Sequence, residues 1–345
     1  MNNFFKIYGN CFIVKGFSES LLYDLENGSY YPIPNDIADI LLEIEENNIQ
    51  VNKLNDEYGE KSKDIKKILD YFVENNLAHY VSNPDSFPKI NLDWKSPYKI
   101  ENAIIEFDNT NSFDVVDVLK QLEILGCQAI EFRFIDKFNL NYLSEILDVF
   151  TESSFKYYSI ATKYNKNISI EEYKKFAFKY RRISHLLVFV KNQNDTYKKL
   201  KESMRSKPKV IYLDKDLKPN MDEQISTNTL IINIPSFVEA QKYNIGLNRK
   251  VCINKNGLIK NFLTHQKDFG SIRTIKIEEV IKTKEFTKKW FLSNDKIEIC
   301  KDCQYRYMCL SNSDIIEKNG KYYKKNYCSF DPIKNIWEKG NQNLN

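Results

Sequence analysis

Between residue 99 and residue 243, short apolar runs alternate with amphipathic stretches long enough for helices. The runs "ENAIIEF", "QAIEFRF", "FKYYSIA" and "HLLVFV" predict strands, and the stretches 113–126, 142–150 and 169–180 predict the helices between them. A lysine-rich helix at about 195–205 precedes two further expected strands, "KVIYL" and "TLIINI". Such alternation predicts βαβ units and a parallel sheet, as an open fold or a partial barrel. We therefore expect an α/β protein.

Length and charge narrow the function classes. A chain of 345 residues can form two or three units with separate cores. Its 51 basic and 47 acidic residues nearly cancel, so nothing indicates a nucleic-acid partner. The first residues lack the features of a signal peptide, and no apolar run approaches the roughly 18 residues of a membrane span. We expect a cytoplasmic protein with neither a nucleic-acid nor a membrane partner.

Residues 1–82 predict strands followed by helices. "FFKIYG" and "CFIVKG", joined by "GN", predict one hairpin, and "LLYDL" and "SYYPI", joined by "ENG", predict a second. A helix capped by Asn35 or Asp36 should follow, then helices at about 50–58 and 63–76, and "LAHYVS" as a closing strand. Residues 83–98, which contain three prolines, predict a linker or a wrap.

This order of elements resembles the PqqD-like winged-helix domains that hold the leader peptides of ribosomally synthesised precursors. The resemblance implies that a leader adds one strand to an exposed sheet edge and lies against the third helix. The corresponding residues of this chain are Ser29, Tyr30, Tyr31, Lys66, Asp70 and Tyr71. The alternative is that these aromatic side chains only cover a small core.

Four of the seven cysteines fall within 29 residues, which is the strongest local signal for chemistry. Cys300, Cys303 and Cys309 follow the spacing C-x2-C-x5-C, and Cys328 comes after a gap. Two thiolates at C-x2-C reach one metal from a single turn, and later cysteines complete its coordination. The pattern predicts a site for zinc or for one four-iron four-sulfur cluster. The alternative is four unrelated reduced cysteines, because disulfides are not expected in the cytoplasm.

"VCINKNGLIKNF", "KDCQYRYMC" and "YCSFDPIKNIW" resemble the SPASM region of radical SAM peptide maturases, in particular those of grasp-with-spasm systems. The early stretch "LLYDLENGSYYPIPN" agrees with this family. The resemblance implies a degenerate radical-SAM-like partial (β/α) barrel over 99–243 and a small cysteine-rich SPASM-like domain over 244–345. It also implies an ATP-grasp ligase as partner.

A complete SPASM region has seven cysteines that ligate two clusters, and this chain departs from that pattern. Cys252 is retained, but Phe262 stands at the next ligand position, and Asn312 and Ser313 stand where another cysteine is expected. The four retained cysteines correspond to the ligands of one cluster, so the other should be absent and Cys252 a small buried remnant. His265 could substitute as a ligand, although we interpret it as a surface histidine.

The catalytic motif of radical SAM enzymes is missing. C-x3-C-x2-C should follow the first barrel strand, but "DNTNSFDVVD" stands there, and Cys127 is interpreted as packing in a turn. S-adenosylmethionine is therefore not an expected cofactor, and no catalytic residue is assigned. Four charged residues could line the top of a barrel or could form ordinary ion pairs; they are Glu106, Asp108, Glu131 and Arg133.

The leading hypothesis is a non-catalytic partner or scaffold in ribosomal-peptide (graspetide-type) maturation. It would bind the precursor leader peptide and the ATP-grasp ligase, with a homodimer as a further option. One alternative is an active peptide-modifying enzyme that uses a redox cluster or the central acidic residues. Another is a winged-helix, metal-binding regulator, which the balanced charge of "KDIKKILDYFVENN" disfavours for DNA binding.

Overall fold

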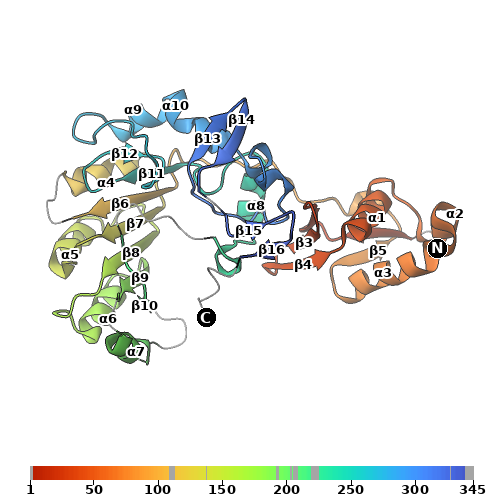
Figure 1. Ribbon diagram of the computed structural model, residues 1–345, viewed down its shortest axis with the longest axis horizontal. Helices are drawn as coiled ribbons and strands as arrows, with labels where there is room; N and C mark the ends of the chain where they lie inside the picture. Colours follow the sequence, from red (N-terminus) through yellow and green to blue (C-terminus); the bar gives the residue numbers. More distant parts are fainter. Residues whose placement is uncertain are drawn as a thin grey trace.

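The computed structural model describes residues 3–108, 113–136, 138–191, 194–202, 204, 209–218, 225–326 and 328–338. The molecule is elongated. The N-terminal strands and helices lie at one end, a large sheet with its helices lies at the other, and the cysteine-rich residues lie between them (Figure 1). No helix of the described part of the chain is long and apolar enough to cross a membrane.

The large sheet has seven strands in the order β10-β9-β8-β7-β6-β11-β12, all parallel to their neighbours except β12, which is antiparallel to β11. This confirms the expected α/β class and mostly parallel sheet. The last two strands come after residue 243, so the sheet includes residues from both sides of the expected boundary. The strands are β6 (Asn102–Phe107), β7 (Ala129–Phe134), β8 (Tyr157–Lys163), β9 (Ile183–Phe189), β10 (Val210–Leu213), β11 (Lys250–Ile253) and β12 (Ile259–Lys260).

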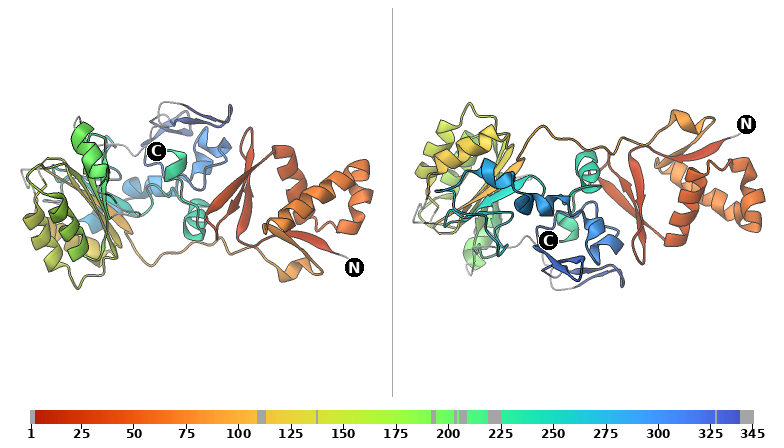
Figure 2. Two further views of the ribbon diagram at one scale, coloured as in Figure 1. Left: turned by 90° about the horizontal axis from the view of Figure 1, so that it is seen from below. Right: turned by 90° about the horizontal axis from the view of Figure 1, so that it is seen from above.

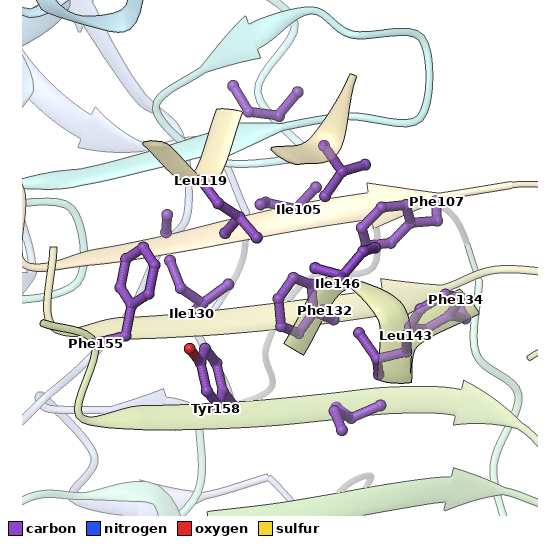
Figure 3. Packing of buried hydrophobic residues seen from close by; sticks show 14 of the residues in the cluster. Ile105, Phe107, Leu119, Ile130, Phe132, Phe134, Leu143, Ile146, Phe155 and Tyr158 are labelled. Carbon is purple, nitrogen blue, oxygen red and sulfur yellow. The ribbon is translucent and has the colours of Figure 1, made fainter. Parts of the chain in front are cut away.

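The helices between these strands cover one face of the sheet (Figure 2). Strands β6 to β10 are neighbours in sequence order, and right-handed crossovers then place each connecting helix on the same side. Side chains such as Phe107 and Phe132 meet Leu119 and Ile146 of the helices in one buried cluster (Figure 3). The helices are α4 (Val115–Ile124), α5 (Leu140–Val149), α6 (Ile170–Lys179) and α7 (Asn194–Glu202).

The opposite face of the sheet holds the cysteine-rich part of the chain. Ile104 of β6 packs in a second buried cluster with Cys252, Phe262 and Ile315. Ile104 lies on the other side of its strand from Ile105, because successive side chains of a strand alternate between faces. The sheet thereby positions the residues around Ile297, Cys300 and Ile315 on this face.

The N-terminal strands form two sheets. β1 (Phe4–Ile7) pairs with β5 (Ala78–Val81), whereas β2 (Cys11–Val14), β3 (Ser20–Asp24) and β4 (Ser29–Ile33) form an antiparallel sheet. The second expected hairpin is confirmed and the first is wrong. Its "GN" turn passes beneath Pro88, whose carbonyl oxygen would lie 2.7 Å from a Cβ at Gly9, and carries the chain from one sheet to the other.

Three expected helices follow: α1 (Asn35–Glu46), α2 (Leu54–Tyr58) and α3 (Ser62–Glu74), with single 3-10 turns η1 (Val51–Lys53) and η2 (Gly59–Lys61) beside α2. The expected cap is wrong, since α1 begins at Asn35 directly after Pro34 and has no side-chain cap. Asn35 is engaged elsewhere, because its Oδ1 accepts a hydrogen bond from Ser20 Oγ at 2.6 Å. Ala38, Leu41 and Leu69 anchor the helices in the N-terminal core.

Residues 83–98 form a strap along the molecule. After η3 (Pro84–Ser86), the Lys89 ammonium donates to the carbonyl oxygens of Ile7, Tyr8 and Cys11. Further along, the Trp94 ring lies 5.0 Å from that of Tyr243, which precedes the last strands of the large sheet. The strap is thus bound to the N-terminal strands near one end and to Tyr243 near the other.

The expected strand "TLIINI" is wrong. Its first residue, Thr229, ends the 3-10 turn η4 (Thr227–Thr229). The next residues are extended, and Leu230 and Ile232 pack against the N-terminal sheet. Asn233 then caps α8 (Ile234–Ala240). The remaining elements are α9 (Ile277–Ile281), α10 (Lys284–Thr287), η5 (Lys288–Phe291), η6 (Asn294–Lys296), η7 (Cys300–Asp302), β13 (Ile315–Lys318), β14 (Lys321–Lys324), β15 (Phe330–Asp331) and β16 (Ile336–Trp337).

Candidate metal centre

The four predicted ligands line one cavity of about 230 Å³, here called the cysteine cavity. Cys300 begins η7, Cys303 follows it, and Cys309 ends the loop 300–309, here called the cysteine loop. Cys328 reaches the cavity from the segment between β14 and β15. Residues that are 28 positions apart in the sequence are therefore gathered around one space. Polar neighbours in the lining include Asn294, Arg306, Asn312 and Lys324.

The thiols surround this space without converging on one point. In the described part of the chain, no group of three or more His, Cys, Asp or Glu side chains is arranged to hold a metal ion. Four thiols around a shared cavity are nevertheless a donor set that suits zinc or an iron–sulfur cluster. The residues present therefore fit such a group in their chemistry.

Burial favours the protonated thiols in the absence of a metal. It raises the pKa of Cys300, Cys303 and Cys328, and the charges of neighbouring cysteines add to the effect. The charge and hydrogen bond of Lys324 act in the opposite direction on Cys300. Burial alone would lower the pKa of Lys324, but the four cysteines keep it above its usual value. A bound metal would replace the thiol protons, so binding should release protons.

The backbone is strained where the cysteine loop begins. Ile299 has a φ of 71°, a left-handed conformation that is unusual for a β-branched residue and costs about 1–2 kcal/mol. Burial of its side chain does not compensate, since Ile299 is 59% exposed. Backbone hydrogen bonds hold the turn, including Asp302 N–H to Ile299 O at 3.2 Å. Such strain persists where the surroundings impose it, often at functional sites.

The β2–β3–β4 sheet and its β2–β3 turn are hydrogen-bonded to the cysteine loop. The buried hydroxyl of Tyr23 donates to the carbonyl oxygen of Gln304 at 2.6 Å. The backbone N–H of Phe17, in the turn between β2 and β3, donates to Asp302 O at 2.8 Å. Both acceptors lie between Cys300 and Cys309. The conformation of the cysteine loop therefore depends on residues almost 300 positions earlier in the chain.

Apolar contacts reinforce these hydrogen bonds. The rings of Tyr30 on β4 and Tyr305 in the cysteine loop meet edge to face, with centroids 5.7 Å apart. One face of the β2–β3–β4 sheet thus packs on the cysteine-rich segment, while Leu22 and Ile33 pack in the core formed with α1 and α3. The buried members of the shared cluster are Val14, Leu21, Tyr23, Leu25, Phe237 and Met308.

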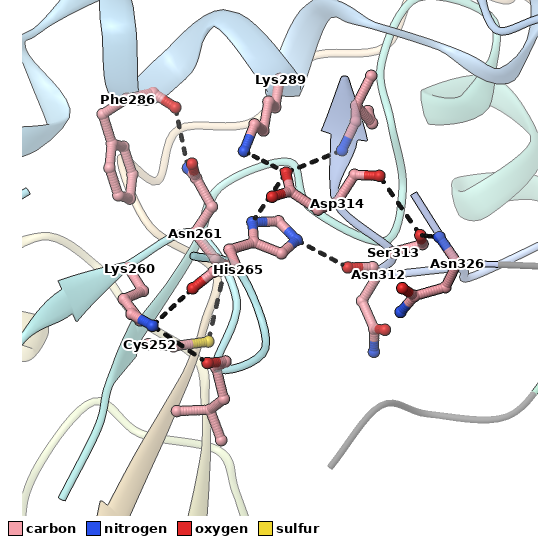
Figure 4. A network of polar contacts seen from close by, with 12 residues as sticks. Cys252, Lys260, Asn261, His265, Phe286, Lys289, Asn312, Ser313, Asp314 and Asn326 are labelled. Carbon is pink, nitrogen blue, oxygen red and sulfur yellow. Dashed lines mark hydrogen bonds and ion pairs between the residues drawn. The ribbon is translucent and has the colours of Figure 1, made fainter. Parts of the chain in front are cut away.

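Cys252, His265, Asn312 and Ser313 lie in a buried polar network (Figure 4). His265 is only 1% exposed, so its interpretation as a surface histidine is wrong. Its Nε2 donates to the backbone oxygen of Asn312 at 2.9 Å, and its Nδ1 lies 3.8 Å from Asp314 Oδ1, which also pairs with Lys289 at 2.5 Å. Cys252 is fully buried, and its thiol lies 3.6 Å from a backbone oxygen.

The strand expected to receive a peptide is an edge strand. β4 pairs only with β3 in the described sheet, so its other edge has no strand partner among the described residues. Pro32 fits this position, because a proline nitrogen is tolerated where it faces away from the ladder. Ser29 and Tyr30 are half-buried, and Tyr31 is 40% exposed.

The other residues of the expected peptide site, Lys66, Asp70 and Tyr71, lie on α3, where two of them contact β5. On α3, the Lys66 ammonium pairs with Asp70, and the Tyr80 hydroxyl of β5 donates to Asp70 at 2.6 Å. Tyr71 is exposed. Within the described residues, no hydrogen bond, ion pair or ring contact joins these side chains to Ser29, Tyr30 or Tyr31. The structure therefore gives the two halves separate contacts.

The four charged residues of interest lie on or just after β6 and β7 of the parallel sheet. Glu106 and Arg133 are register partners on β6 and β7, and they are 1% and 4% exposed. Arg133 pairs with Glu131, and Asp108 lies 3.8 Å from the Lys255 ammonium. Arg133 also lies over the Phe262 ring at 5.8 Å. Glu131, Arg133 and Asp108 thus take part in ion pairs, and Glu106 accepts a hydrogen bond from the backbone N–H of Lys255 at 3.4 Å.

Several residues of the site were not among the predicted ones. Lys324 stands four positions before Cys328 in "KKNYC", so a cation near the thiols was visible in the sequence. The roles of Tyr23 and Gln304 had no local signal, because they depend on how distant segments pack. Neither the scan against protein-family models nor the search of curated proteins finds a match for this chain.

Proposed function

We propose that this protein is a scaffold in ribosomal-peptide maturation that holds a precursor's leader peptide and presents it to an ATP-grasp ligase. The observation that carries the proposal is the shared position of the β2–β3–β4 sheet. One face of this sheet packs on the cysteine loop, the other on the N-terminal helices, and the edge strand β4 has no further strand partner among the described residues. The resemblance to grasp-with-spasm maturases supplies the ligase as partner.

In this proposal the cysteine cavity holds a structural centre, either one four-iron four-sulfur cluster or zinc, ligated by Cys300, Cys303, Cys309 and Cys328. Zinc bound at about 2.3 Å would bring its sulfurs to within about 4 Å of one another and leave no cavity between them. The cavity of about 230 Å³ that these cysteines share with other residues has room for a cluster, whose iron atoms separate its ligands. The centre would stabilise the folded cysteine loop.

The centre would also support the peptide edge. Tyr305 lies between Cys303 and Cys309, and its ring packs on Tyr30 of the open strand. Tyr23 of the neighbouring strand holds the same loop. A loop ordered by its metal therefore stiffens the sheet to which a leader would add. This connection gives the retained cysteines a role that needs no S-adenosylmethionine chemistry.

Fluorescence anisotropy of the labelled leader peptide from the cognate precursor, titrated with the full chain, tests the proposal. We expect binding below about 100 μM, where even weak recognition is measurable. Tyr31→Ala should weaken binding by about fivefold or more if the ring contacts the peptide. Tyr157→Ala is the matched control, since Tyr157 is exposed on β8 of the large sheet. Absence of binding at 100 μM, or equal loss in both variants, contradicts the proposal.

A further inference from the structure

The cysteine cavity contains a buried amide that lacks a partner. Asn312 is 1% exposed and lines the cavity, and its Nδ2 has no hydrogen-bond partner among the described residues. Leaving such a donor unsatisfied costs about 1–3 kcal/mol. In Figure 4 the Asn312 side chain points away from the His265 network that holds its backbone. The hydrogen bond to His265 therefore fixes the backbone of Asn312, while its side-chain amide can donate to a group bound in the cavity.

Lys324 lines the same cavity from the neighbouring hairpin. Two hydrogen bonds join the segment that follows Lys324 to the segment that follows Asn312. The backbone N–H of Asn326 donates to Ser313 Oγ at 3.0 Å, and the backbone N–H of Lys325 donates to Asp314 O at 2.7 Å. All four cysteines line this cavity together with Lys324 and Asn312. A fixed amide donor and a cation therefore face one thiol cavity from adjacent segments.

We infer that Asn312 and Lys324 donate hydrogen bonds to the sulfur atoms of a four-iron four-sulfur cluster in the cysteine cavity and raise its reduction potential. This inference rests on the proposed function and commits to the cluster. Four thiolates give the cluster a net negative charge, and reduction adds one more negative charge. Hydrogen-bond donors and a nearby cation stabilise that reduced form, and the loss of either lowers the potential. A residue at a lost ligand position thereby serves the centre that remains.

The test uses the full chain purified anaerobically, with iron and sulfide measured before each redox titration. Asn312→Asp replaces the donor with a carboxylate, and Lys324→Gln removes the cation. Both should lower the midpoint potential, while Lys324→Arg, which keeps the charge, should stay close to the unmodified protein. Asn261→Asp is the matched control, because Asn261 is equally buried, bonds to Phe286 O at 2.9 Å and is not among the residues that line the cavity.

The outcomes separate the inference from the proposed function. Lowered potentials in Asn312→Asp and Lys324→Gln, with an unchanged potential in Asn261→Asp, support it. An iron-loaded protein whose potential does not respond to either change overturns the inference but leaves the cluster. Zinc without iron overturns the inference while leaving the scaffold proposal, which peptide binding tests independently. If Asn312→Asp retains no iron, Lys324→Gln and Lys324→Arg decide, since a charge effect requires them to differ.

Discussion

Removing one hydroxyl group, in Tyr23→Phe, should loosen the cysteine loop without disturbing the core. The Tyr23 ring is fully buried in the cluster that joins the N-terminal sheet to the cysteine-rich segment, and phenylalanine preserves it. What is lost is the 2.6 Å hydrogen bond to Gln304 O. Depriving a buried acceptor of its donor costs about 1–3 kcal/mol, which corresponds to roughly 5- to 150-fold in the equilibrium for loop opening.

Hydrogen exchange of the full chain, read by mass spectrometry, measures this opening directly. Peptides that cover residues 300–310 should exchange roughly 5- to 150-fold faster in Tyr23→Phe than in the unmodified protein, because exchange reports local opening free energy. Peptides from the large sheet should exchange as before. An unchanged exchange rate for residues 300–310 would mean that the hydroxyl contributes nothing to the stability of the loop.

Tyr212→Phe is the matched control. Tyr212 is also a buried tyrosine, but its hydroxyl has no hydrogen-bond partner in the described part of the chain, and it belongs to β10 of the large sheet. The same atoms are removed without loss of a bond to the cysteine loop. Faster exchange of residues 300–310 in this variant as well would show a general loss of stability instead of a local one.

Two further changes test other parts of the structure. Cys303→Ser should lose bound metal and melt at a lower temperature, because structural metal binding adds to folding free energy. Cys127→Ser changes a buried cysteine that does not line the cavity, so this variant should retain its metal. Full metal content in Cys303→Ser would remove Cys303 from the ligand set. Burial raises the pKa of Glu239 from 4.5 to about 7, so the folded carboxyl keeps its proton where the unfolded one has lost it, and the unfolding free energy should fall as pH rises through that window. Urea titrations across these pH values should show a shallower fall for Glu239→Gln, and identical slopes would contradict the assigned pKa.

The central fold could be predicted because its signals are local. The strands β6, β7 and β8 are short apolar runs, each followed by a helix with its own side-chain cap: Asp114 for α4, Asn139 for α5 and Ser169 for α6. These signals need no knowledge of distant segments. The "TLIINI" run shows the limit, because its apolar residues satisfy a tertiary interface and not a ladder.

Pairing between distant segments could not be predicted in the same way. The turn sequence between β1 and β2 favoured a hairpin, but β1 instead pairs with β5, more than 70 residues later. The turn sequence gives no information about β5, because the pairing of β1 with β5 is determined by tertiary packing. His265 follows the same rule, since only the fold brings Asn312 and Asp314 to its ring.

In the candidate site too, the part with a local sequence signal could be predicted and the part that depends on distant segments could not. The four cysteines were recognisable from their spacing, and the structure places all four around one cavity. The expected peptide face was inferred from the order of elements, and its two halves turn out to have separate contacts. Spacing within a loop constrains geometry directly, whereas the relation between a strand and a helix depends on how the whole domain packs.

The iron, acid-labile sulfide and zinc content of the full chain purified without oxygen decides whether the four cysteines hold a metal centre. If Cys300, Cys303, Cys309 and Cys328 hold one cluster, the protein should contain about four iron and four sulfide per chain, and Cys303→Ser should lose them. A protein that folds fully and binds neither iron nor zinc would contradict the claim that these cysteines form a metal centre.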